Sequence, residues 1–509
     1  METKTAAIEM RNITKRFGPV LANDKVWLNI YRGEILALLG ENGSGKTTLM
    51  NMLSGIYFPD EGEIKIDGKE VVIRSPKDAF DNGIGMIHQH FKLVDVLTAA
   101  ENIVLGLPGK LDLKAASAKI REICDKYGFS VDPTQKIYDM SVSQKQTVEI
   151  VKVLYRGADI LILDEPTAVL TPQETDKLFA VLRNMRNDGK AIVIITHKMH
   201  EVEALSDRVA ILRHGQFIGD MLTKDTNAQE MTNMMVGHAV SLNIERPDPV
   251  DPKPRVEVKG LTVRSVDGII KLDDVSFTAN SGEILGIAGI SGCGQKELLE
   301  AIAGLQTVES GSISYSEDDG SREELIGKDP LSIAELGVSL SFVPEDRLGM
   351  GLVGNMNLAD NMMLRSFRRG KSIFTDRRSP RALAESVVQE LSVSTPSVDT
   401  PVRRLSGGNV QKVLVGREIA SAPTVLLTAY AVRGLDIHSS YTIYDLINRQ
   451  KKAGVAVIFV GEDLDVLLEL CDRILVLCGG KVSGIVPGRG AEKREVGMMM
   501  TKLGGQSHE

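Results

Sequence analysis

The stretch Gly40-Glu41-Asn42-Gly43-Ser44-Gly45-Lys46-Thr47-Thr48 follows the apolar run 35–39 and precedes the helix-like segment 49–53. Its three glycines let consecutive backbone N–H groups curl around phosphate oxygens. Lys46 can bridge the outer phosphates, and Thr47 offers a hydroxyl group to Mg²⁺. Strand, glycine loop and helix are the context in which the pattern GxxxxGK[ST] forms a Walker A loop. We therefore predict that this loop binds a nucleotide.

Length, composition and charge limit the classes of protein to which the chain could belong. The chain has 509 residues, enough for two or three domains, and it is 43% hydrophobic and 25% charged. Its formal net charge of −8 does not favour nucleic acid as a partner. The four cysteines form no CxxC pair, which favours reduced thiols in cytosol and suggests no zinc site. No signal peptide and no apolar run of membrane-spanning length is evident, so any membrane role requires a partner.

Further chemistry follows the loop at the ends of apolar runs. Residues 84–88 lead to Gln89, residues 160–163 lead to Asp164 and Glu165, and residues 192–196 lead to His197. Apolar runs that end in polar groups are typical of parallel strands whose carboxyl ends form a site. Upstream of the loop, Phe17 could stack on an adenine ring, although an aromatic residue there could equally serve the core.

The same order of features occurs twice. Residues 245–255, ERPDPVDPKPR, form a proline-rich charged stretch suited to a stiff linker. Beyond it, Gly289 lies 249 residues after Gly40, and a later set of positions keeps a common offset of 265: Ser406 after Ser141, Asp436 after Thr171 and Glu462 after His197. A duplication explains this register. We place the first domain at 6–243, the linker at 244–255 and the second domain at 256–504.

Several motifs identify a family. Leu405–Asn409 reads LSGGN, residues 164–167 read DEPT, and Thr196-His197 follows, so that together with the Walker A loop nearly the whole chain resembles the ATP-binding cassette (ABC) family. The tandem arrangement, VPEDR at 343–347 and RGLD at 433–436 resemble the ATPase subunits of bacterial importers for simple sugars and nucleosides. HQHFKLV at 88–94, with ILILDEPTAVLTP at 160–172, is most similar to the nucleoside branch.

The resemblance implies a fold and a composite site. The fold class is α/β, with two tandem P-loop nucleotide-binding domains, each a RecA-like parallel-sheet core with an antiparallel β subdomain and a helical subdomain, near 96–138 and 357–404. ATP would lie between the Walker A loop of one domain and the signature segment of the other. From the first domain it would meet Phe17, Gly40 to Thr48, Gln89, Asp164, Glu165 and His197. From the second it would meet Ser406, Gly407, Gly408, Asn409 and Asp436.

Roles follow from the same resemblance. Mg²⁺ would be bound by Thr47, Gln89 and Asp164. Glu165 would act as the base or orient the attacking water, and His197 would brace the γ-phosphate. The catalytic set is therefore Glu165, His197 and Gln89.

The reciprocal site has lost its chemistry. Gln295 stands at the lysine position, Lys296 at the Mg²⁺ hydroxyl position, and Ala429 and Tyr430 at the carboxylate positions. Lys296 cannot substitute for the lysine, because one residue along a helix turns a side chain by about 100°. Glu345 and Glu462 replace the glutamine and the histidine, MSVSQ at 140–144 replaces LSGGQ, and Thr171 replaces aspartate. All losses fall on one composite site, whereas Ser406 to Asn409 and Asp436 survive. We therefore predict one competent ATP site to which the second half contributes, rather than a second half that is only a structural relic.

The predicted function is ATP hydrolysis that energises import through two separate integral-membrane permease subunits, docked near Gln89 and Glu345. The chain would sit at the cytoplasmic face of the membrane, with an external binding lipoprotein supplying a nucleoside. A pentose or hexose is the alternative cargo. Two alternative functions from other classes of protein are a soluble tandem ATPase that acts on ribosomes or DNA, and an ATP sensor that does not hydrolyse ATP. The dismantled site and short linker disfavour the first, and Lys46, Thr47, Asp164 and Glu165 disfavour the second.

Overall fold

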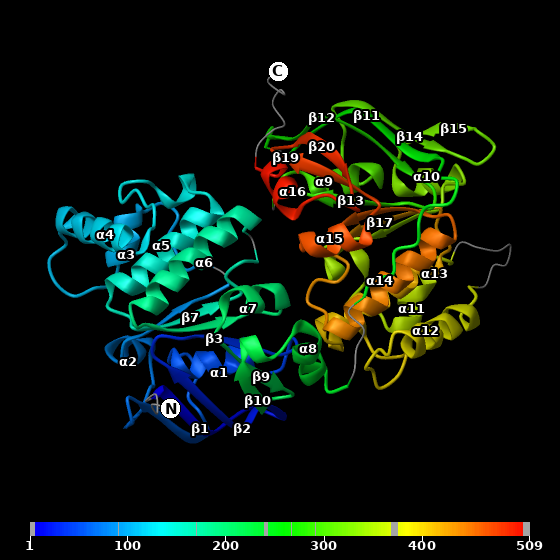
Figure 1. The fold of residues 1–509 in the computed structure, drawn as a ribbon. Coiled ribbons are helices and arrows are strands. Elements are labelled where there is room, and N and C mark those ends of the chain that lie inside the picture. Colours follow the sequence, from blue (N-terminus) through cyan, green and yellow to red (C-terminus); the bar gives the residue numbers. More distant parts are fainter. Residues whose placement is uncertain are drawn as a thin grey trace. The chain divides into compact units, whose positions relative to one another are not determined.

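In the computed structural model, the described residues are 6–89, 91–168, 170–238, 243–265, 267–290, 292–367 and 375–501. The chain divides into two compact units, 1–241 and 242–509 (Figure 1). Three residues of the predicted motifs, His90, Val169 and Ser291, lie outside the described residues, as do 239–242, 266, 368–374 and 502–504 of the predicted domains.

The first unit is built around a six-stranded sheet whose order is β10-β9-β3-β8-β7-β6. The strands are parallel except β10, which pairs antiparallel with β9. Every residue of β3, β7 and β8 is buried, since both faces of the sheet are covered, which is why these strands are uninterrupted apolar runs. The bounds are β3 Ile35–Leu39, β6 Ile84–Ile87, β7 Ile160–Asp164, β8 Ala191–Ile195, β9 Arg208–Arg213 and β10 Gln216–Leu222.

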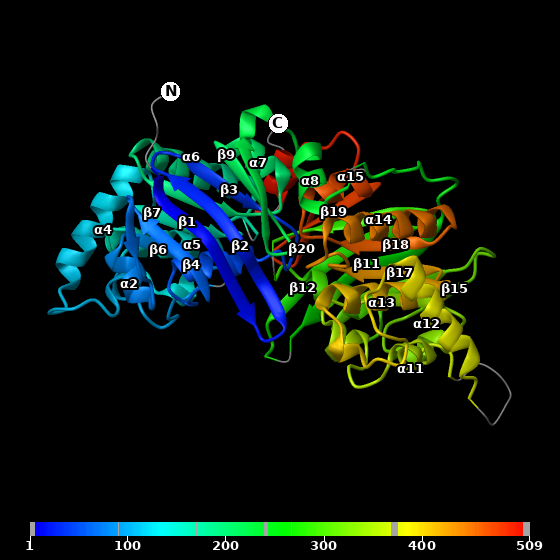
Figure 2. The same cartoon turned by 90° about the horizontal axis from the view of Figure 1, so that it is seen from below.

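An antiparallel sheet of order β2-β1-β4-β5 forms a second layer of this unit. Its two long strands run side by side (Figure 2). Helix α1 (Lys46–Leu53) packs between the two sheets, and its buried Leu49 and Met50 share one core with Ile8 of β1 and Ile162 of β7. The sheet therefore holds the helix that begins at the end of the phosphate loop. The bounds are β1 Ala6–Phe17, β2 Val20–Tyr31, β4 Glu61–Ile66 and β5 Lys69–Val71.

The remaining helices include a subdomain with a core of its own. Ile103, Ile120, Cys124 and Val148 from α3, α4 and α5 pack together, which confirms the predicted helical subdomain. The bounds are α2 Pro76–Asp81, α3 Ala99–Val104, α4 Leu113–Tyr127, α5 Val142–Tyr155, α6 Pro172–Asn187, α7 Met199–Leu205 and α8 Ala228–Val236, with short 3₁₀ turns at Ile137–Asp139 and Thr223–Asp225.

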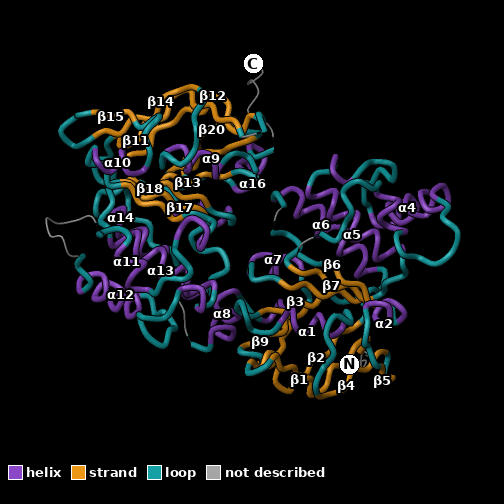
Figure 3. The backbone as a smooth tube through the Cα atoms, turned by 180° about the vertical axis from the view of Figure 1, so that it is seen from behind, coloured by secondary structure: helices purple, strands orange, loops and turns teal. Residues whose placement is uncertain are grey.

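The second unit repeats this plan strand for strand. Its central sheet has the order β16-β17-β18-β13-β19-β20, and its antiparallel sheet has the order β12-β11-β14-β15. Helices α11 to α14 lie on the side of the central sheet away from the antiparallel strands (Figure 3). The strands are β11 Pro254–Arg264, β12 Ile270–Asn280, β13 Ile284–Ala288, β14 Ser310–Ser316, β15 Arg322–Glu324, β16 Leu340–Val343, β17 Val425–Ala429, β18 Ala456–Val460, β19 Arg473–Cys478 and β20 Lys481–Pro487.

The helices of the second unit follow the same order as those of the first. Two cores flank its central sheet, one shared with α9 and the antiparallel sheet and the other with α11 to α16. The bounds are α9 Gln295–Ile302, α10 Pro330–Glu335, α11 Leu358–Met363, α12 Arg378–Glu390, α13 Gly407–Ala420, α14 Ile437–Lys452, α15 Leu464–Leu470 and α16 Lys493–Met499, with a π turn at Arg347–Gly351 and a 3₁₀ turn at Val402–Arg404.

None of the helices in the described ranges is long and apolar enough to cross a membrane. The four cysteines are unpaired thiols, and three of them are buried.

Candidate functional site

The phosphate loop of the first unit depends on the backbone freedom of its glycines. Gly43 and Gly45 adopt left-handed φ angles of 83° and 95°. A Cβ atom on Gly45 would lie 2.4 Å from the carbonyl oxygen of Ala22, whereas a Cβ atom on Gly43 would meet nothing within 4 Å. Gly45 is thus required by packing, while the space beside Gly43 is free for a ligand. The Oγ atom of Ser44 is buried, and none of the described residues satisfies it.

Lys46 begins helix α1 inside this loop. Its Nζ atom donates hydrogen bonds to the carbonyl oxygens of Gly40 and Glu41, at 2.6 and 2.9 Å. Burial lowers the pKa of the Lys46 ammonium group, and the carboxylates of Glu165, Asp164 and Glu41 oppose this shift. The ammonium group is therefore poorly solvated, and a phosphate group would supply the anionic partner that it lacks.

The carboxylate pair stands where β7 ends. Asp164 is the last residue of β7, and its Oδ2 atom accepts a hydrogen bond of 3.3 Å from the hydroxyl of Thr47. Burial raises the pKa of Asp164, the neighbouring Glu165 raises it further, and Thr47 and Lys46 act against this. A divalent cation between Asp164 and Thr47 would favour the ionised carboxylate.

Glu165 adopts a left-handed backbone conformation, with φ of 49°. Its Oε1 atom lies 2.8 Å from Nδ1 of His197, which follows the adjacent strand β8. Its Oε2 atom is buried, and the described residues provide no hydrogen-bond partner for it. The strained turn thus holds one carboxylate oxygen against the histidine and leaves the other without a hydrogen-bond partner among the described residues.

The remaining sequence-predicted residues of the first unit lie at the surface. Gln89 follows β6 and is exposed, as are Asn42 and Thr47, whereas Thr48 is half-buried. Phe17 at the end of β1 is 41% exposed, and its ring meets that of Tyr57 edge to face at a centroid distance of 5.1 Å. Tyr57 could not be predicted from the sequence, because the residue lies in the turn after α1 and shares no motif with Phe17.

A hydrogen-bond network centred on Glu201, which was not predicted from the sequence, connects the segments that follow β7 and β8. The buried carboxylate of Glu201 accepts hydrogen bonds from the hydroxyls of Thr167 and Thr196, at 2.5 and 3.4 Å, and lies 3.2 Å from Nζ of Lys198. This network ties the DEPT segment to the residue just before His197. Glu201 sits on α7, and its role depends on contacts between three segments rather than on a local pattern.

In the second unit, the signature residues begin a helix. Ser406 is the N-cap of α13, its Oγ atom accepts a hydrogen bond from the backbone N–H of Asn409, and Gly407 is exposed. Exposed N–H groups at the start of a helix of 14 residues are suited to bind an anion. Asp436 is the N-cap of α14 and accepts two hydrogen bonds from Ser439, at 2.7 and 2.6 Å. The predicted reach of Asp436 to the other unit stays a prediction.

The loop of the second unit keeps the shape of a phosphate loop without its chemistry. Gly292 and Gly294 have φ angles of 86° and 97°, close to those of Gly43 and Gly45. Gln295 is buried and donates a hydrogen bond of 3.2 Å to the carbonyl oxygen of Ile290. Lys296 points elsewhere, since its Nζ atom lies 3.7 Å from Glu300, one helical turn further on.

The position of the catalytic carboxylate is filled by Tyr430, with the same left-handed backbone, φ 53°. Burial, together with the nearby carboxylates of Glu345 and Glu462, raises the pKa of the phenol to about 12. Tyr430 is therefore neutral at physiological pH and cannot act as a base. Ala429 and Tyr430, which stand at the positions of Asp164 and Glu165, therefore supply neither a metal-binding carboxylate nor a base.

Comparison with known proteins agrees with this geometry. The sequence profile described as "ABC transporter" matches residues 23–168 and 272–428. The chain is 42% identical to the nucleoside import ATP-binding protein NupA of Lactococcus lactis, covering 99% of each. It is 39% identical to the glucose import ATP-binding protein TsgD13 of Haloferax volcanii, covering 98% of this chain and 96% of that one. It is 41% identical to the guanosine import ATP-binding protein NupO of Bacillus subtilis, covering 97% of each.

Both halves of the chain match one family, the relatives align over nearly their full lengths, and the first unit presents a complete phosphate loop with its carboxylates and histidine. The chain therefore belongs to the ATP-binding cassette (ABC) transporter family, as a tandem ATPase.

Proposed function

We propose that the chain is the ATP-hydrolysing subunit of a nucleoside importer and that it works with one competent ATP site. The observation that carries the proposal is the arrangement of Lys46, Asp164, Glu165 and His197 around one phosphate loop. Two of the three relatives named above are importers of nucleosides or guanosine by name. The third is named for glucose, so a sugar remains the alternative cargo.

In the proposed site, ATP binds with its phosphates in the loop 40–48 and Phe17 against the adenine. Thr47 and Asp164, with Gln89, would hold Mg²⁺, which neutralises phosphate charge when it is bound. Among the described residues no group of three or more histidine, cysteine or acidic side chains could hold a metal ion by itself. This fits Mg²⁺, because in such sites the nucleotide and water supply most of the ligands.

Glu165 then takes a proton from the attacking water on its unpartnered Oε2 atom, or orients that water. His197 fixes the other oxygen, Oε1, at 2.8 Å. The rigid turn at Glu165 places the base before the substrate arrives, which reduces the reorganisation needed in the transition state. Lys46 supplies a positive charge, and its poor solvation makes the phosphate contact stronger.

We further propose that Ser406, Gly407, Gly408 and Asn409, with Asp436, complete this site from the second unit by directing helix N–H groups toward the γ-phosphate. The reciprocal site would be catalytically silent. The support is chemical: Tyr430 and Gln295 cannot serve a metal or a base, while the start of α13 is exposed and keeps the LSGGN sequence.

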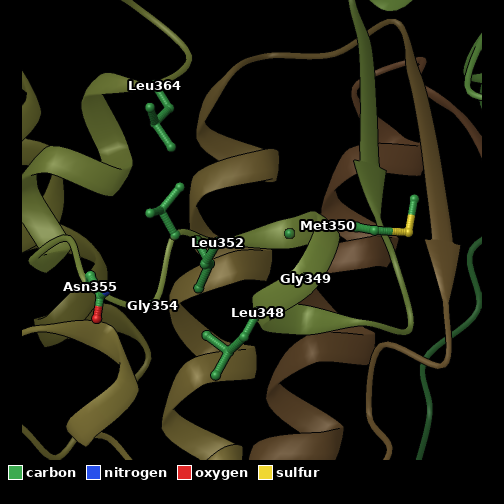
Figure 4. Close-up of a pocket in the computed structure, with 9 residues that line it drawn as sticks. Leu348, Gly349, Met350, Leu352, Gly354, Asn355 and Leu364 are labelled. Carbon is green, nitrogen blue, oxygen red and sulfur yellow. The ribbon is translucent and has the colours of Figure 1, made fainter.

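The proposed partners are two integral-membrane permease subunits, with an external binding lipoprotein, and the chain would act peripherally at the cytoplasmic face. The docking positions would be near Gln89 and Glu345. Directly after Glu345 the structure has a pocket of about 450 Å³, lined by residues 348–355 and Leu364 (Figure 4). Leu348, Met350 and Val353 among its lining residues are each more than 40% exposed, which supports an apolar contact with a protein partner.

Uptake by cells that lack this gene tests the function. We expect uptake of labelled nucleosides to fall more than uptake of ribose, and we expect the parent gene to restore it while Glu165→Gln does not. Equal loss of ribose uptake would favour the sugar alternative. A chain that sediments with ribosomes and not with membranes would support the soluble alternative and refute the importer.

A further inference from the structure

An arginine joins the dismantled positions of the second unit. The Arg433 guanidinium lies 2.5 Å from Glu345 and 2.8 Å from Glu462, through its Nη1 and Nε atoms respectively. It also lies 5.9 Å from the ring centre of Tyr430. One cation thus bridges two carboxylates and covers the face of the phenol.

The three partners of Arg433 come from three separate strand ends. Glu345 follows β16, Tyr430 follows β17 and Glu462 follows β18, neighbours in one parallel sheet. The equivalent positions of the first unit are Gln89, Glu165 and His197, and Ala168 stands where Arg433 does. In a working cassette the proposed substrate and metal would face these strand ends, whereas here a residue of the chain itself connects them.

A second arginine continues the network to the signature segment. Nη1 of Arg347 donates a hydrogen bond of 3.0 Å to the carbonyl oxygen of Gly407, and Nη2 donates to the carbonyl oxygen of Arg433. Gly407 is the first residue of α13. Arg347 begins the π turn whose later residues line the pocket of Figure 4. A continuous chain of polar contacts therefore runs from Glu462 through Arg433 and Arg347 to the start of the signature helix.

We propose that Arg433 and Arg347 are positioning residues for ATP hydrolysis, which hold the start of α13 in place by a permanent ion-pair network where an active cassette would rely on bound nucleotide. The inference rests on the proposed function, in which Ser406 to Asn409 act on the ATP of the first unit. It assigns a role to the altered strand ends: they support the signature segment, which the proposed hydrolysis requires.

Removal of Arg433 would change the electrostatics of this group of residues. Without Arg433, the cation that joins Glu345 and Glu462 would be lost, and the like charges at the ends of β16 and β18, on either side of β17, would repel each other. The pairs are about half exposed, so each contributes little to global stability. The network is therefore better suited to fix local geometry than to stabilise the fold. A shift of a catalytic element by about 1 Å costs on the order of 100-fold in rate.

The test compares variants of the full chain assembled with its permease. Arg433→Ala and Arg347→Ala are expected to lower kcat for ATP by about 10- to 100-fold. ADP binding should stay unchanged, because ADP lacks the phosphate that the signature segment contacts. The matched control is Arg264→Ala, which removes an equally exposed 2.5 Å ion pair with Glu309 on the antiparallel sheet. It should leave kcat unchanged.

Rescue separates positioning from simple damage. Millimolar guanidinium should restore part of kcat to Arg433→Ala, whereas methylammonium should not, because only a planar fork reaches both carboxylates. Absence of rescue together with reduced ADP binding would mean general damage and would overturn the inference.

The variant Ser406→Arg distinguishes a failure of the positioning inference from a failure of the proposed ATP site. If Ser406→Arg abolishes hydrolysis while Arg433→Ala and Arg347→Ala do not reduce it, the positioning inference is wrong and the proposed site stands. If Ser406→Arg also hydrolyses ATP at the parent rate, the signature segment has no role, and the composite site falls together with the inference.

Discussion

Arginine at the two signature serines, Ser406 and Ser141, should have similar effects on stability, but only Ser406→Arg should lower the rate of ATP hydrolysis. Each serine is an exposed N-cap of a helix of 14 residues. The Oγ atom of Ser141 accepts a hydrogen bond of 3.2 Å from the N–H of Gln144, and that of Ser406 accepts one of 3.4 Å from Asn409. Loss of a serine cap costs about 0.5–2 kcal/mol of stability.

The first unit has the stronger cap. The Oε1 atom of Gln144 accepts a hydrogen bond of 2.8 Å from the backbone N–H of Ser141, which completes a capping box. The side-chain amide of Asn409 instead donates to the Oγ atom of Ser406 and accepts from the backbone N–H of Ser394. Ser141→Arg should therefore destabilise the chain at least as much as Ser406→Arg. For hydrolysis the order reverses, because only Ser406 would face a working phosphate site. Loss of such a contact should lower kcat by about 10²–10³-fold.

The assay is the ATPase rate of each variant assembled with its permease, with urea unfolding of the isolated chain as the stability measurement. Similar ATPase losses from both variants would refute the model of one active site, and loss from Ser141→Arg alone would invert it. A variant Ser141→Arg that slows transport but not hydrolysis would show that the silent interface still takes part in the cycle.

Three further predictions concern the phosphate loop and its carboxylates. Lys46→Ala should weaken ATP binding by about 10- to 100-fold, as expected when a charge-assisted contact is lost, whereas Gln295→Ala should not; calorimetric titration measures both, and comparable losses would contradict the assignment. Glu165→Gln should keep ATP affinity and lower turnover by about 10²–10⁴-fold, so a turnover near the parent rate in a coupled ATPase assay would rule Glu165 out as the base. The pKa of Asp164 is raised mainly by burial, so the folded state binds its proton more tightly than the unfolded state, and the ionised side chain lowers stability above that pKa. Asp164→Asn should consequently make the nucleotide-free chain more stable at neutral pH, with the gain disappearing as the pH falls through the raised pKa. Urea unfolding across pH measures this, and a less stable variant at neutral pH would show that the carboxylate is already compensated.

Much of the first site could be predicted from the sequence, because each of its parts is local. The pattern GxxxxGK[ST] between a strand and a helix is typical of a phosphate-binding loop, and an apolar run that ends in Asp164 and Glu165 places them at the edge of a parallel sheet. The contact between Glu165 and His197 was not predicted, because it depends on β7 and β8 being neighbours in the sheet. The left-handed turn at Glu165 could not be predicted, because glutamate has no preference for that conformation.

The substitutions in the second unit were visible in the sequence as losses, but not what replaced the lost groups. Glu345, Arg433 and Glu462 are separated by up to 117 positions, and no periodic pattern links them. Only the order of β16, β17 and β18 brings them together.

Thr171 in the first unit shows a related limit of prediction from sequence. It reads as a lost aspartate, yet it is a buried N-cap in a capping box with Glu174, so Thr171→Ala would not be silent for stability even if hydrolysis were unaffected.

The proline-rich stretch 245–255 is predicted from the sequence to be a stiff linker, and in the structure hydrogen bonds from the second unit fix its first residues. Prolines leave carbonyl oxygens without local donors, and here side chains of the second unit supply those donors: Asn448 binds the carbonyl oxygen of Glu245 at 2.6 Å, and Lys451 binds that of Pro247. Lys451 is buried and also pairs with Asp472 at 2.7 Å, so its release would leave a carboxylate poorly compensated. The first residues of this stretch therefore belong to the second unit mechanically, and stiffness comes from these contacts and not from proline content alone.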